Sequence, residues 1–216
     1  MRHLSTLWSV RSLFLSEIIS IIISIIATLF NANYVRYLLQ HNILINIIKV
    51  MISIFIYYNL STINRNLFKS SIFKILTILI SFLSLILNEF FALQGDSGLT
   101  ISNVKQFVVI LLEIPCIYYL CKGFCTIVCE SNKNSSLYIG WRRIGIANIV
   151  EHVILIIITL LSSLGVSNSI YLLLLTFSLL CSVFLMFIHI FYLVYIYKTL
   201  LMIKERQGDG SPVLTK

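Results

Sequence analysis

Three polar residues in one apolar segment are spaced so that they can act together. Asn148 precedes Glu151 by three positions and His152 by four, so that on a helix all three lie on one broad face. A carboxylate beside an imidazole can relay protons, bind a cation or hold a polar ligand. The same residues can instead form a structural hydrogen-bond network between helices. The sequence leaves both roles open.

Two more ionisable residues lie near the middle of apolar segments. Lys49 and Glu113 are expected at similar depths, so they can pair across two helices, where each charge would offset the other's lost hydration. The alternatives are that Lys49 extends to the membrane surface and that Glu113 is protonated. Pro115 leaves the Leu111 carbonyl without its helical partner, which predicts a kink. The predicted ligand or ion site comprises Lys49, Glu113, Asn148, Glu151 and His152.

Two other ionisable residues are expected near the membrane surface. Glu17 lies close to the inner end of the first apolar segment, where we expect an interfacial or structural position. His189 precedes an aromatic run that is typical of a membrane interface. Two histidines such as His152 and His189 can ligate a haem iron or a transition metal. The interfacial position of His189 argues against that alternative.

The cysteines Cys121, Cys125 and Cys129 recur every four residues and predict one stripe along a helix. Three thiols can bind a soft metal or carry palmitate. Cysteine is also a small apolar residue, and the paired CxxC spacing of zinc sites is missing from the sequence. The motifs of nucleotide binding, zinc hydrolysis and serine hydrolysis are missing too. We therefore expect no metal, no cofactor and no enzymatic activity.

The composition indicates a membrane protein. The chain has 216 residues, of which 59% are hydrophobic and 11% are charged, whereas soluble domains carry about 25% charged residues. This excludes a soluble enzyme, a disordered tail and a collagen-like rod. The net charge of +8 is expected to face anionic lipid headgroups, and we expect no nucleic-acid partner.

Six apolar segments are long enough to cross a bilayer, which takes roughly 20 residues. The sequence therefore predicts an all-α fold, a polytopic bundle of six transmembrane helices. The bundle is expected to span residues 13–198, between an N-terminal segment at 1–12 and a tail at 199–216. The six segments are Leu13–Asn31, Asn42–Leu60, Ile72–Leu93, Val104–Ile127, Ile144–Val166 and Ser169–Tyr197.

Basic residues alternate between the connections, and this predicts the orientation. The first, third and fifth connections between the segments carry few basic residues. They hold only Arg36 and Lys105, the latter beside Asp96. The positive-inside rule therefore predicts that both termini are cytoplasmic. The residues assigned to the cytoplasmic side are Arg2, Arg11, Arg65, Lys69, Lys74, Lys122, Lys133, Arg142, Arg143, Lys198, Lys204, Arg206 and Lys216.

Four stretches lie between residues 11 and 206, so that they range over most of the chain. They are RSLFLSEIISIIISIIATLF, IYYLCKGFCTIV, WRRIGIANIVEHVILIII and HIFYLVYIYKTLLMIKER. They resemble stretches of uncharacterised small six-span membrane proteins of low-GC Gram-positive bacteria. The resemblance implies a multi-pass protein of the bacterial cytoplasmic membrane, without catalytic residues. The size, six helices and cytoplasmic ends are also similar to the substrate-binding subunits of energy-coupling-factor vitamin transporters. Their first helix carries an Ala-x-x-x-Ala pattern, whereas Ala27 and Ala32 here are spaced differently.

Bulky helices with few polar residues favour a non-enzymatic binding, accessory or immunity-type component. Such a protein acts through membrane lipids or a protein partner within the membrane, and we expect its bundle to lack a sizeable central cavity. The alternative is a membrane subunit of a small-molecule transporter with a polar intramembrane site. That function requires the polar side chains to converge on one cavity.

Overall fold

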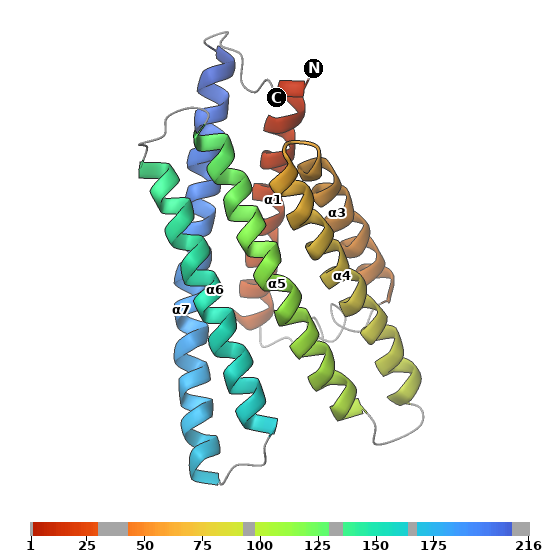
Figure 1. Cartoon of the computed structure of the whole chain (residues 1–216). Coiled ribbons are helices and arrows are strands. Elements are labelled where there is room, and N and C mark those ends of the chain that lie inside the picture. The colour runs from red at the N-terminus through yellow and green to blue at the C-terminus, as the bar shows by residue number, and fades with distance from the viewer. Residues whose placement is uncertain (1, 30–42, 93–97, 130–135, 164–167, 209–216) are drawn as a thin grey trace.

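The computed structural model describes residues 2–29, 43–92, 98–129, 136–163 and 168–208, and they form helices throughout apart from one tight turn at residues 62–64. Figure 1 shows the helices running side by side in one elongated bundle. The fold is therefore all-α, as predicted. The helices are α1 (Arg2–Leu29), α3 (Ile43–Ser61), α4 (Arg65–Ala92), α5 (Gly98–Cys129), α6 (Ser136–Ser163) and α7 (Asn168–Gly208).

Each helix corresponds to one predicted segment, but four helices extend further at the same end of the bundle. α1 begins eleven residues before Leu13, α4 seven before Ile72 and α6 eight before Ile144, while α7 continues eleven residues past Tyr197. Hydropathy locates the apolar part of a helix, whereas backbone hydrogen bonding continues into the basic part. Both expected domain boundaries, after residues 12 and 198, therefore fall inside continuous helices.

The six helices form a closed ring. Each packs against its neighbours in the chain, in the order α1, α3, α4, α5, α6, α7, and α1 packs against α7 to complete the circuit. The start of α1 and the end of α7 lie at the same end of the bundle (Figure 1). A ring of this kind gives each helix an inner face. Polar residues on the inner faces can therefore meet in the middle of the bundle.

Within the described residues, four stretches are long and apolar enough to cross a membrane. They are Arg65–Leu87, Lys105–Cys129, Ser136–Leu161 and Met186–Glu205, and α3 contains a shorter apolar stretch at Asn46–Ser61. Large apolar side chains such as Met51, Leu83, Leu173 and Leu180 are exposed on the outside. An apolar outer surface around buried polar groups suits a lipid environment. The architecture is compatible with an integral membrane protein.

An aromatic cluster joins three helices at the basic end. The Trp141 ring is fully buried and stacks on Phe124, with ring centroids 4.4 Å apart. Its Nε1–H donates to Thr199 Oγ1 over 2.9 Å. On the same side of α6, a Cβ added to Gly140 would collide with the Tyr195 ring. These contacts fix α6 against α5 and α7 and so set the position of the next turns of α6, which carry Asn148 and His152.

Candidate functional site

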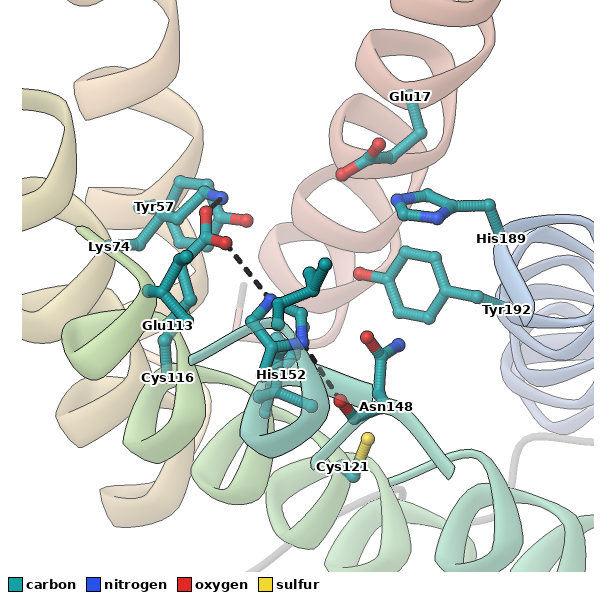
Figure 2. A pocket seen from close by; sticks show the side chains of 14 residues that line it. Glu17, Tyr57, Lys74, Glu113, Cys116, Cys121, Asn148, His152, His189 and Tyr192 are labelled. Carbon is teal, nitrogen blue, oxygen red and sulfur yellow. Dashed lines mark hydrogen bonds and ion pairs between the residues drawn. The ribbon is translucent and has the colours of Figure 1, made fainter. Parts of the chain in front are cut away.

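A partly open cavity of about 250 Å³ lies among the six helices. Every helix contributes a polar side chain to its lining, although the helices come from distant parts of the chain. These side chains point into a common space in Figure 2. They are Glu17 from α1, Tyr57 from α3, Lys74 from α4, Glu113 from α5, His152 from α6 and His189 from α7.

Glu113 lies at the centre of an ionic network across three helices. Lys74 Nζ donates to Glu113 Oε1 over 3.3 Å. The second oxygen, Oε2, lies 3.1 Å from His152 Nε2. The side chains of Lys74 and Glu113 are 32% and 27% exposed, so the network borders open space. The charges are paired yet accessible from the cavity.

The hydrogen bonds of His152 show that this network holds a proton. His152 Nδ1 donates to the Asn148 backbone carbonyl over 2.8 Å, and a carbonyl can only accept. The contact between His152 Nε2 and Glu113 Oε2 therefore needs a second proton, because a bare Nε2 and a carboxylate oxygen are both acceptors. The His152–Glu113 pair contains that proton either as an imidazolium or as a carboxylic acid.

The start of α4 determines where Lys74 lies. Asn64 Oδ1 accepts from the Leu67 backbone N–H over 2.9 Å, which is an N-cap interaction. The amide of the same Asn64 donates to the Gly123 carbonyl of α5 over 3.1 Å. Leu67 packs directly on Gly123, where a Cβ would not fit. The start of α4 is thus held on α5, and two turns later Lys74 faces Glu113.

One further hydrogen bond holds α4 on α5 at a point closer to the site. Ser70 Oγ donates to the Cys116 carbonyl of α5 over 2.9 Å, and both residues are buried. Pro115 lies inside α5, which continues through it, so a proline next to the site is tolerated within the helix. Cys116 also lines the cavity. The α4–α5 contact therefore combines polar and apolar interactions up to the level of Glu113.

The cavity wall opposite Lys74 comes from α1 and α7. Figure 2 shows Glu17, His189 and Tyr192 pointing into the cavity from this side. Tyr192 is buried, whereas His189 is exposed. The Asn148 amide lies between the two walls in the same view.

Three of the five predicted site residues line this cavity, namely Glu113, Asn148 and His152. Lys49, one possible partner of Glu113 by depth, is exposed on α3 and is not part of the cavity lining. α3 packs against α1 and α4, so that α4 lies between Lys49 and α5. A matching depth was therefore insufficient, because the direction of a side chain around its helix and the order of the helices decide which residues meet.

Glu151 is buried, with 2% exposure, but it does not line the cavity. Neither carboxyl oxygen has a hydrogen-bond partner among the described residues. Consecutive helical residues point about 100° apart. Glu151 and His152 consequently lie toward opposite edges of the buried face of α6. His152 contacts Glu113 over 3.1 Å, and no hydrogen bond joins it to Glu151.

Sequence reasoning missed Lys74, Glu17 and His189 as site residues. Lys74 was assigned to a basic loop, but α4 begins at Arg65 and includes Lys74. Glu17 and His189 were expected in interfacial or structural positions rather than in a site, but both line the cavity. A run of basic residues without Gly or Pro before an apolar segment could have indicated that the helix starts earlier.

No protein-family model, curated protein or solved structure matches this chain. The resemblance to small six-span proteins of low-GC Gram-positive bacteria stays a prediction. The site is therefore interpreted from its own geometry.

Within the ranges that the structure describes, no cluster of three or more His, Cys, Asp and Glu side chains is arranged to hold a metal ion.

The stripe of Cys121, Cys125 and Cys129 has mixed surroundings. Cys121 is buried and lines the cavity, while Cys125 Sγ lies 3.8 Å from the Tyr138 carbonyl. The described polar groups of the cavity are suited to forming hydrogen bonds and ion pairs with a small ligand.

Proposed function

We propose that this protein is a membrane component that binds a small polar molecule inside its helix bundle, as a transporter subunit does. The observation that carries the proposal is that all six helices direct a polar side chain into one cavity. Ionisable groups inside a bilayer are costly, and their usual reason is a ligand or ion pathway. Polar side chains that only join helices need no cavity between them.

The sequence favoured an accessory or immunity-type component with no sizeable cavity. The cavity of about 250 Å³ instead supports the alternative, a small-molecule transporter subunit. The function remains non-enzymatic in this proposal, because binding and release break no covalent bond. Membrane lipids surround the helices, and a protein partner within the membrane would supply the energy if the protein does not transport alone.

The same proposal includes the topology. All six helices cross the bacterial cytoplasmic membrane, and both termini are cytoplasmic. The helix α3 has 19 residues, which corresponds to about 28 Å at 1.5 Å per residue, close to the roughly 30 Å hydrocarbon core. Basic residues gather at one end of the bundle, as expected for a cytoplasmic side. Arg65 and Arg142 lie near the starts of α4 and α6, and Lys122 and Lys204 lie near the ends of α5 and α7.

A retention experiment tests the binding function without assuming an energy source. The full chain, purified in mild detergent and immobilised, is incubated with a defined mixture of amino acids, amines, organic acids, nucleosides and vitamins. After washing, mass spectrometry identifies the retained solutes. We expect at least one solute to be retained in proportion to the protein.

Two lysine variants distinguish the site from the rest of the molecule. Lys74→Gln removes a charge from the cavity, whereas Lys49→Gln removes an equal charge from an exposed position on α3. We expect Lys74→Gln to lose the retained solute and Lys49→Gln to keep it. A wild-type protein that is folded but retains nothing from the mixture would overturn the proposed function, as would equal retention by both variants.

A further inference from the structure

The two walls of the cavity differ in formal charge. The cationic wall consists of Lys74, Glu113 and His152. Its charges are the Lys74 ammonium, the Glu113 carboxylate and the proton held between Glu113 and His152, whichever of the two carries it. One negative and two positive charges leave this wall with one net positive charge.

The anionic wall consists of Glu17, His189 and Tyr192. It lies opposite the cationic wall in Figure 2, where the Glu17 side chain extends from α1 toward the cavity. A carboxylate that is partly withdrawn from water is stabilised by a cation that approaches it. The imidazole and the phenol beside it add hydrogen-bonding groups to the same wall.

The space between the walls suits a short molecule with a polar and an apolar side. Asn148 offers an amide that can donate and accept. The apolar side chains of Ile117, Leu120 and Leu155 cover the remaining surface. The cavity volume of about 250 Å³ is many times the roughly 10–15 Å³ that a single water molecule needs. That volume accommodates a molecule the size of an amino acid.

We infer that the ligand is a small zwitterion whose ammonium group faces Glu17 and whose carboxylate faces Lys74 and His152. This inference rests on the proposed binding function and specifies its ligand class. A simple organic cation would satisfy Glu17 but would bring no negative charge to the cationic wall. A simple anion would complement the cationic wall but would bring no positive charge to Glu17. A molecule with both charges complements both walls.

The experiment measures the binding of six probes to the purified full chain in detergent. Glycine, β-alanine, 4-aminobutyrate and 6-aminohexanoate are zwitterions with increasing charge separation, while butylamine and butyrate carry one charge each. Saturable increases in Tm give a Kd for each probe, because a ligand that binds the folded state stabilises it. We expect one zwitterion to bind at least tenfold more tightly than both singly charged probes.

Two glutamate variants test the orientation of the ligand. Glu17→Gln removes the anionic wall's charge and should weaken the best zwitterion at least tenfold, without weakening butyrate. Glu205→Gln changes an exposed glutamate near the end of α7 and should leave both affinities unchanged. If Glu17→Gln does not fold, the comparison of the six probes on the wild-type protein still tests whether the ligand is a zwitterion.

Three results would overturn the zwitterion and leave the proposed function standing. They are butylamine binding as tightly as the best zwitterion, butyrate doing so, or no probe binding while the retention experiment identifies a solute of another class. Retention of no solute at all, by contrast, would remove the proposed function itself.

Discussion

Glu113 Oε2 lies 3.1 Å from His152 Nε2, and this contact connects α5 to α6 beside the central cavity. The other oxygen of the same carboxylate binds Lys74 of α4. One side chain thus holds three helices and also borders the space in which a ligand would lie. Its structural and functional roles are separable, because stability and ligand retention are measured independently.

The coupling between Glu113 and Lys74 is measurable by a double-mutant cycle. Glu113→Gln and Lys74→Met should each lower the free energy of unfolding by about 1–3 kcal/mol, because each leaves a charged partner without its counter-charge. The double variant should lose less than the sum of the two. Thermal unfolding in detergent, monitored as loss of helical circular dichroism, provides the measurement.

The matched control for this cycle is Glu205→Gln, which changes an exposed glutamate on α7. We expect it to alter the free energy of unfolding by no more than about 0.5 kcal/mol. Strictly additive losses for Glu113→Gln and Lys74→Met would contradict the direct ion pair.

Close packing of α6 on α7 depends on the missing side chain of Gly140. Any Cβ at this position would collide with the Tyr195 ring, so we expect Gly140→Ala to cost about 1–3 kcal/mol by overpacking. Gly145→Ala should cost less, because its Cβ would lie 3.0 Å from the Cys121 Cβ and needs only a small adjustment. The Tm values of both variants test this order.

A smaller residue opposite Gly140 should relieve the collision. We expect Tyr195→Leu to restore part of the Tm that Gly140→Ala loses. If Gly140→Ala has the Tm of the wild type, the α6–α7 contact described above is incorrect.

Removal of the Glu151 carboxyl should stabilise the protein. The side chain is buried and has no hydrogen-bond partner among the residues that the structure describes, and burial of an unpaired polar group costs free energy. We therefore expect Glu151→Met, which has a similar length, to raise the Tm by several degrees. Ligand retention should persist, since Glu151 does not line the cavity. A lower Tm would reveal a partner for the carboxyl.

Reporter fusions test the topology. Alkaline phosphatase is active only outside the cytoplasm, while green fluorescent protein becomes fluorescent within it. We expect fusions at either terminus to be fluorescent and without phosphatase activity, and a phosphatase insertion at Gly95 or Ser167 to be active. Active phosphatase at one terminus only would indicate an odd number of spans and would contradict the six-span proposal.

The helical class and the location of the six helices follow from local properties of the chain. A run of roughly 20 apolar residues is recognisable from hydropathy, because each residue contributes its transfer free energy almost independently. The relevance of Glu113, Asn148 and His152 was recognisable for the same reason, since a polar residue in an apolar run is costly wherever it points.

The contacts of the site were decided only by the tertiary structure. The Lys74–Glu113 pair depends on Asn64 and Leu67 holding the start of α4 on Gly123. The meeting of Glu17 with residues of α7 depends on closure of the ring by α1 and α7. Hydropathy reports depth in the membrane, whereas contact also requires direction around each helix and the order of neighbours. Those two quantities arise from packing between segments far apart in the chain.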